Sequence, residues 1–289
     1  MHRVLTLAIG TLTSAAMGIA HADMSVSAMA AGRYNDNVGN AAESDERIAD
    51  EVLAARIGLY DLVVLDGADT LSAGGDLSGE WFDHLTGLRN ASLDASLALR
   101  HKWALGLMAP WTRATFSVGR TDSDAGYRDA TWYRAALATG KRFTPAFNML
   151  LEYNFEHRSA SPGEEVQPWV SADVFSGNSQ ALALSIEYAF GNHISLNASA
   201  LWRRGDVVVS SDEYYYSYAE ARAIEEDPAL GEEYYAYRFL GTTYGGRVGL
   251  SAALTAHSAL SLSYQLLSTH AAGNNYRNSI PELRWDYRY

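Results

Sequence analysis

The sequence predicts an all-β protein, a closed antiparallel transmembrane β-barrel of about twelve strands. Oily and polar side chains alternate with a period of two in a dozen segments of roughly ten residues, the length at which a tilted strand crosses a bilayer. No later stretch holds the roughly 18 consecutive apolar residues that a spanning helix needs. Mean hydropathy is −0.15 although 48% of the residues are hydrophobic, as expected where alternate residues face lipid and water.

The first 22 residues are predicted to be a secretory signal peptide. A short basic start precedes an apolar run over 4–20, and Ala-His-Ala at 20–22 has the small-residue pattern of a cleavage site. We therefore expect a signal peptide, 1–22, followed by one barrel domain, 23–289.

Twelve segments carry the alternation and are the predicted strands. In 146–157, the clearest of them, Phe147, Leu151 and Phe155 share one face, and Glu152 and Glu156 share the other. The segments are 25–34, 52–62, 71–81, 92–100, 111–120, 131–140, 146–157, 180–190, 193–203, 243–254, 259–268 and 280–289. Ten or fourteen strands remain alternatives, because the alternation is ambiguous over 62–131 and within 204–240.

The last segment, Ile-Pro-Glu-Leu-Arg-Trp-Asp-Tyr-Arg-Tyr over 280–289, has one oily and one charged face and ends flush on an aromatic residue. With this alternating last strand and its aromatic end, the chain resembles Gram-negative outer-membrane β-barrels. The closing strand of those proteins usually ends on Phe, where this chain has Tyr289. The resemblance implies a place in the bacterial outer membrane, among its lipid and lipopolysaccharide. It also implies that Trp285, Tyr287 and Tyr289 form the signal read by the barrel insertion machinery.

Long polar connections alternate with short turns. The long ones are 35–50, 82–91, 121–129, 158–178, 204–240 and 271–277, and the short ones are 65–69, 101–110, 141–145, 191–192 and 255–258. In outer-membrane barrels the short turns face the periplasm and the long loops face outside. With an even number of strands, both termini are expected on the periplasmic side.

The strands of a secreted β-sandwich or a lipocalin-like barrel would also alternate apolar and polar residues, but such a protein would bury its apolar face in a core of large side chains. Here the apolar faces hold much Ala and Leu, with aromatic residues near the strand ends, as in the aromatic girdles of membrane barrels. The predicted girdle residues are Tyr34, Trp81, Trp111, Trp132, Tyr133, Tyr188, Trp202 and Trp285.

The polar face of the strands is predicted to line the lumen and carries many charges. The bases are Arg33, Arg56, Arg100, Arg113, Arg134, Arg203, Arg247, Arg284 and Arg288, and the acids are Asp76, Glu80, Asp94, Glu152, Glu156, Glu187, Glu282 and Asp286. Such charges either line an aqueous pore or pair into a plug that closes a narrow barrel. A lining of arginine alone would point to acidic oligosaccharides, as in the twelve-stranded oligogalacturonate-type porins. This mixed lining does not.

The longest loop is rich in tyrosine and carboxylate. A helix over 219–226, capped by Ser217 and ended by Pro228, is predicted within it. Its tyrosines are Tyr214, Tyr215, Tyr216, Tyr218, Tyr234, Tyr235 and Tyr237. They either bind a sugar or protein partner or stabilise a hairpin that continues the strands above the membrane.

A lipid hydrolase of the outer membrane is a further class to weigh, because some such barrels carry a Ser and His site near the outer rim. The candidates are His84, His157 and His270, with Ser159, Ser161 and Glu156 close to His157. No motif of such an enzyme is present, so catalysis is not expected. His101, His193 and His257 fall at short turns and read as solvated turn residues.

Composition excludes other classes. The chain has no Cys, which removes disulfides and thiolate metal sites, and its net charge of −12 argues against nucleic acid as a partner. We expect no cofactor and no metal. The favoured function is a passive channel or porin for small solutes. The alternative is a closed surface barrel with an adhesive or envelope-assembly role through its loops.

Overall fold

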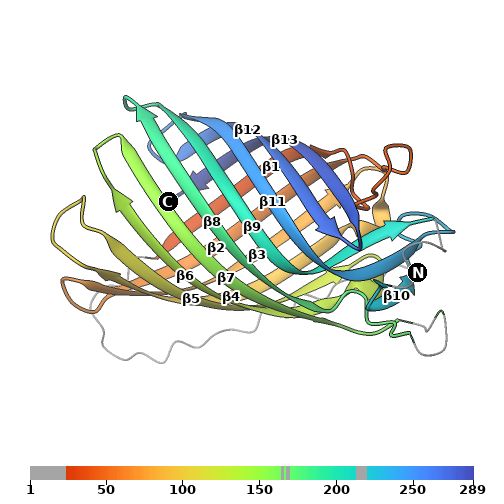
Figure 1. The fold of residues 1–289 in the computed structure, drawn as a ribbon. Helices are drawn as coiled ribbons and strands as arrows, with labels where there is room; N and C mark the ends of the chain where they lie inside the picture. Colours follow the sequence, from red (N-terminus) through yellow and green to blue (C-terminus); the bar gives the residue numbers. More distant parts are fainter. Residues whose placement is uncertain (1–23, 164–165, 167–169, 213–219) are drawn as a thin grey trace.

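The computed structural model describes residues 24–163, 166, 170–212 and 220–289. They form one antiparallel sheet rolled into a barrel (Figure 1). Its elements are β1 (Ser25–Asn35), β2 (Asp50–Val64), β3 (Asp69–Phe82), η1 (Thr86–Leu88), β4 (Asn90–Lys102), β5 (Trp111–Ser123), η2 (Gly126–Arg128), β6 (Ala130–Arg142), β7 (Phe147–Ala160), β8 (Gly177–Phe190), β9 (Ile194–Ser211), β10 (Ala223–Glu226), β11 (Tyr235–Ala253), β12 (Ser258–Ala271) and β13 (Asn274–Arg288). The predicted signal peptide, 1–22, lies outside the described residues.

All the strands except the short β10 form the barrel wall, which confirms a closed antiparallel barrel of twelve strands. Each wall strand pairs with its neighbours in the chain, and β13 pairs with β1 to close the ring. Val26 and Tyr289 complete this seam by exchanging two backbone hydrogen bonds, of 3.0 and 2.8 Å. Closure pairs both edges of the twelve-stranded wall, which is the condition for a sheet to cross a bilayer.

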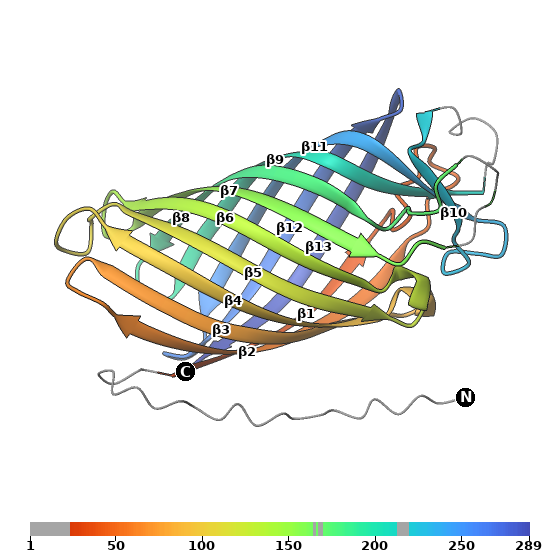
Figure 2. The same ribbon diagram turned by 90° about the horizontal axis from the view of Figure 1, so that it is seen from below.

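The two ends of the barrel differ (Figure 2). We call the end that holds the short turns and the carboxyl terminus the turn end. The opposite end, with the longer connections and β10, is called the loop end. No helix in the described part of the chain is long and apolar enough to cross a membrane.

The predicted alternation places oily side chains on the outside of the wall. In β4, Leu93, Leu97 and Leu99 are 65%, 52% and 47% exposed, whereas Asp94 and Ser96 between them face the interior. Similar rows of exposed Leu, Ile, Val and aromatic side chains run along the other strands. A water-soluble protein seldom exposes so large an apolar surface, so this surface suits contact with hydrocarbon.

Two of the predicted girdle residues are wrong. Trp111 and Trp132 have the same strand parity as Arg113 and Arg134, and the guanidinium groups of these arginines lie 5.7 and 5.4 Å from the respective indole rings inside the barrel. Their position near strand ends suggested the girdle, but only parity decides which side a side chain faces. Trp81 and Tyr133 do lie on the outside.

Several strands extend beyond the predicted segments at the loop end. β9 reaches Ser211 and β11 begins at Tyr235, so the predicted loop over 204–240 is shorter than expected. The predicted loop over 271–277 is in fact a two-residue turn at Ala272 and Gly273, whose φ values are 50° and 77°. Two consecutive positive φ angles match the twist of a hairpin, which lets β12 and β13 stay paired up to the turn.

The predicted helix over 219–226 is also wrong in its described part, because residues Ala223–Glu226 form strand β10. β10 pairs with the outer end of β11, on the edge that β12 leaves free by ending at Ala271. This free edge offers backbone partners that a short exposed helix would not have, so tertiary pairing overrides the local helix signal.

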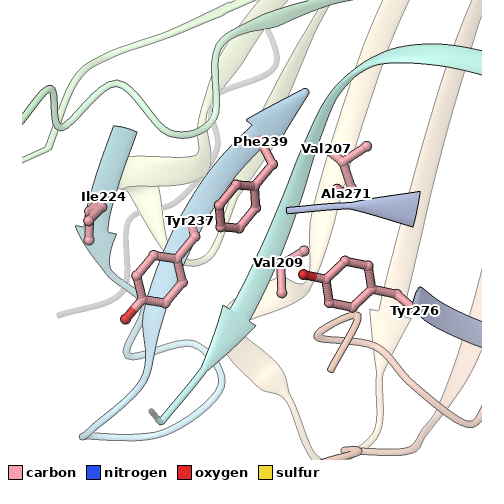
Figure 3. Packing of buried hydrophobic residues seen from close by; sticks show 7 residues of the cluster. All are labelled: Val207, Val209, Ile224, Tyr237, Phe239, Ala271 and Tyr276. Carbon is pink, nitrogen blue, oxygen red and sulfur yellow. The ribbon is translucent and has the colours of Figure 1, made fainter. Parts of the chain in front are cut away.

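The connections at the loop end pack over the barrel mouth. Residues 36–49, 83–89, 124–129, 170–176 and 220–234 contribute to three clusters of buried apolar side chains, and we call this assembly the loop cap. In the largest cluster, Val207, Tyr237, Phe239 and Tyr276 of the wall strands pack with Ile224 of β10 (Figure 3). The loops are therefore anchored to the wall by an apolar core of their own.

The exposed outer rows give a first prediction. Leu97→Arg places a charge near the middle of β4 on the lipid side and should destabilise the barrel by about 2–4 kcal/mol in a bilayer. Ser96→Arg, one residue away on the lumen side, should cost much less. Equilibrium unfolding in phospholipid vesicles measures both, and equal effects would contradict the assignment of the two faces.

Candidate functional site

The barrel interior contains cavities at two positions along its axis. Towards the turn end, a cavity of about 420 Å³ is bounded by residues from β7, β8, β9, β11, β12 and β13, with Ser199, Ser251 and Ser263 among them. Beneath the loop cap, a second cavity of about 570 Å³ is bounded mainly by β1 to β5. Small lumen-facing side chains, such as those of these serines, leave the cavities unfilled. The interior is therefore the candidate functional site.

The strand registers place all the charged residues predicted for the polar face on the interior side of the wall. Most of them are joined in ion pairs. The pairs are Arg33–Glu80 (2.7 Å), Arg56–Asp76 (2.7 Å), Arg113–Glu152 (3.7 Å), Arg134–Glu156, Arg247–Glu282 (2.5 Å) and Arg284–Asp286 (2.5 Å). Pairing lowers the cost of holding charge inside a narrow barrel. That these residues line a conducting pore remains a prediction.

Five predicted residues have no ion pair among the described residues: Arg100, Arg203, Arg288, Asp94 and Glu187. The guanidinium of Arg100 lies 4.7 Å from the ring of Trp111, on which it can stack. Asp94 lies directly opposite Asp76 on β3. The interior charge is thus compensated in most places and left uncompensated in a few.

The structure describes only some of the predicted loop tyrosines. Tyr214, Tyr215, Tyr216 and Tyr218 lie outside the described residues. Tyr234 packs against the buried cluster around Leu230, and Tyr235 begins β11. Tyr237 is fully buried, so it is part of the packing of the loop cap rather than of a binding surface.

The residues considered for a hydrolase do not form a catalytic arrangement with one another. His157 faces outward, where its Nδ1 lies 2.8 Å from Asn178 Oδ1 and its ring lies 4.9 Å from that of Tyr133. Glu156 faces the opposite side of the wall and is bound by Arg134, so it cannot orient His157. His84 is bound to Asp50 at 3.1 Å, and His270 contacts Tyr244.

The predicted insertion signal lies on the lipid-facing side of β13. The rings of Trp285 and Tyr287 stack with centroids 6.1 Å apart, and Tyr289 is 71% exposed at the end of the chain. Because Tyr289 pairs with Val26, the last residue also belongs to the seam that closes the barrel. Recognition of these residues by the insertion machinery remains a prediction.

Asp227 holds the loop cap together, although no motif or periodicity in the sequence singles it out. Its side chain is fully buried and accepts hydrogen bonds from Tyr127 Oη at 2.8 Å, Arg128 Nη2 at 2.5 Å and Ser210 Oγ at 2.6 Å. It thereby joins three segments that are far apart in the sequence. Burial beside this carboxylate raises the pKa of Tyr127 to about 12. The only local signal is Asp-Pro, which favours a turn.

Glu225, two residues earlier on β10, is also buried but has no positive partner of its own within the described residues. Among these residues its Oε2 atom has no hydrogen bond, and the ionised side chains that influence it are Asp227, Arg128 and Asp173. Burial, followed by the charge of Asp227, raises the pKa of Glu225 to about 7. Its carboxyl group is therefore mainly neutral in mildly acidic solution.

We predict that Asp227→Ala loosens the loop cap, because Tyr127, Ser210 and the half-buried Arg128 lose the buried carboxylate that they share. Breaking a fully buried ion pair costs about 3–5 kcal/mol, which is the upper limit here. Amide hydrogen exchange should accelerate over 223–234 while the wall strands stay protected. Glu233→Ala, which removes an exposed carboxylate from the same loop, is the matched control. Equal exchange in the two variants would contradict the role of Asp227.

The raised pKa of Glu225 predicts a pH dependence of the loop cap. The folded cap holds this proton more tightly than an unfolded loop does, so the stabilisation is complete below the ordinary pKa of 4.5 and is lost as pH rises through about 7. Exchange in β10, corrected for intrinsic rates, should be slower at about pH 5.5 than at about pH 8. Glu225→Gln should remove most of this difference. Equal protection of β10 in the wild type at both pH values would refute this pH dependence.

No protein-family model and no curated protein sequence matches the chain. Among solved structures, the COG4313 outer membrane channel from Pseudomonas putida F1 is similar over 95% of this chain and 97% of that chain, with 14% identity and a TM-score of 0.60. The NanC porin is similar over 90% and 98% of the two chains, with 10% identity and a TM-score of 0.48. The chain therefore has the fold of an outer-membrane β-barrel of the kind formed by the COG4313 channel.

Proposed function

We propose that this protein is a passive channel for small solutes in the bacterial outer membrane. The observation that supports this function best is the make-up of the interior. Ionic and small hydroxyl side chains surround cavities of about 420 and 570 Å³ inside a wall with an apolar exterior. Water-filled space lined by charge is what a solute needs in order to cross a bilayer. The fold shared with an outer membrane channel supports the same function.

The loop cap limits what such a channel passes. Apolar clusters and the hydrogen bonds of Asp227 hold the loops over the mouth, so large solutes are excluded there. The loop cap is also the feature that favours the alternative function, a closed barrel with an adhesive or envelope-assembly role. However, the tyrosine and apolar side chains of the cap are buried and serve packing, whereas a binding surface needs exposed side chains.

The proposal includes an orientation. The turn end, with the carboxyl terminus and the start of β1, faces the periplasm, and the loop end faces outside. Short turns on the periplasmic side and longer loops outside are the rule in such barrels. The partners proposed with this orientation are membrane lipid and lipopolysaccharide around the wall, and the insertion machinery at the last strand.

Planar-bilayer recording of the refolded protein tests the channel. We expect small conductance steps, and we expect larger or longer openings for Asp227→Ala, because the cap that narrows the mouth is loosened. Glu233→Ala should behave as the wild type. Absence of steps in the wild type and in Asp227→Ala, over a range of voltages, would overturn the proposal and leave the closed barrel.

A further inference from the structure

A third cavity, of about 360 Å³, lies under the loop cap between β7, β8 and β9. Arg158 of β7 and Arg203 of β9 line it, and Arg128 and Phe175 contribute from the loop cap. We propose that this cavity binds a small solute by an oxyanion group, a carboxylate or a phosphate, through Arg128, Arg158 and Arg203. The inference rests on the proposed channel function and names the class of solute that would pause there.

The room for a ligand comes from the strand in the middle. Arg158 lies opposite Gly177 of β8, and Arg203 lies opposite Ala181. Ser179, between these two positions, also lines the cavity. Because β8 presents small side chains between two strands that carry long cationic ones, the guanidinium groups border open space rather than another side chain.

The charges of Arg158 and Arg203 are not neutralised by the groups that hold them. Arg158 Nη2 donates to the backbone carbonyl of Arg128 at 2.8 Å, and Arg203 Nη2 donates to that of Asp206 at 3.0 Å. A carbonyl accepts a hydrogen bond but carries no full charge. Within the described part of the chain, no carboxylate lies within 4 Å of either guanidinium group.

The carboxylates in the cavity lining are bound by other bases. Glu156 accepts a hydrogen bond from Arg134 Nε at 3.0 Å. Asp206 accepts one from Arg222 Nη1 at 2.8 Å and one from the backbone N–H of Asn178 at 2.8 Å. Arg128 is paired with Asp227, so its remaining donors can serve a ligand without adding an unbalanced charge.

The chemistry of the guanidinium group favours an oxyanion as the ligand. Water can accept a hydrogen bond from Arg158 or Arg203 but cannot neutralise their charges, whereas a carboxylate or phosphate does both and matches the planar fork of arginine.

The size of the cavity suits a molecule of about the size of a monosaccharide. Small-molecule sites have volumes of about 300–1,000 Å³, and one water takes up about 30 Å³ of liquid. Glucose 6-phosphate and glucose are therefore suitable probes, because they share a ring and differ in the oxyanion.

Isothermal titration of the detergent-refolded protein tests the site without relying on conductance. We expect glucose 6-phosphate to bind at least tenfold more tightly than glucose. Arg158→Gln and Arg203→Gln should each weaken the binding of glucose 6-phosphate by at least tenfold. Arg204→Gln is the matched control, because it removes the same charge from the next residue of β9, whose side chain faces outward. Its binding should equal that of the wild type.

Equal affinity of the wild type for the two sugars would overturn the inference, and this comparison needs no variant to fold. Unchanged binding in both Arg158→Gln and Arg203→Gln would place the anion elsewhere and would also overturn it. Conductance steps without preferential binding of the phosphate would refute the site but leave the channel. Preferential binding that is lost in the two variants, in a protein that shows no steps, would support the site and refute the channel.

Discussion

The structure depends on one constraint, that every backbone N–H and C=O group within a bilayer must find its partner in the protein. A sheet meets this condition only by closing on itself. Here the closure is the pairing of β13 with β1, completed by two hydrogen bonds between Val26 and Tyr289. Once the ring is closed, alternate residues face opposite environments, and this alternation governs everything that the interior can do.

Closure also sets the electrostatic problem of the interior. A twelve-stranded barrel is narrow, so arginine and carboxylate side chains from neighbouring strands meet inside it, as in Arg56 with Asp76 and Arg247 with Glu282. Such pairing makes the charged lining affordable in a wall surrounded by lipid. The places where pairing fails, at Arg158 and Arg203, are therefore more informative about binding than the total number of charges.

The loop cap shows a second way of using the same strands. β9 and β11 continue beyond the apolar belt, and their outer ends carry Val207, Val209 and Phe239 as buried residues. At the loop end the interior face is no longer a polar lumen but the floor of a small apolar core. Asp227 ties this core to the loop that contains Tyr127 and Arg128. In the proposed channel, a mouth narrowed in this way would admit only small solutes.

The sequence by itself determined a closed antiparallel barrel and which rows of side chains face lipid and which face the interior. It predicted about twelve strands but left ten and fourteen as alternatives, and the structure decided for twelve. A period of two is a local property, readable from residues such as Leu93, Asp94 and Leu97 without knowledge of their partners. It also showed the short turns at the turn end, but it missed the two-residue turn between β12 and β13. The girdle prediction used position near strand ends rather than parity, and it was wrong for Trp111 and Trp132.

Only the tertiary structure decided what depends on contacts between distant segments. β10 replaced the predicted helix because β11 offered a free edge, and Asp227 became the centre of the loop cap because Tyr127 and Ser210 converge on it. Which arginines are paired was likewise undecided, since Glu156 faces Arg134 across β6 and β7, while Arg203 donates to the backbone carbonyl of Asp206 and has no ion pair within 4 Å in the described residues. Periodicity decides which face of the sheet a side chain occupies. The distances between side chains of different strands and the burial of each, which set its chemistry, arise only when the strands are brought together.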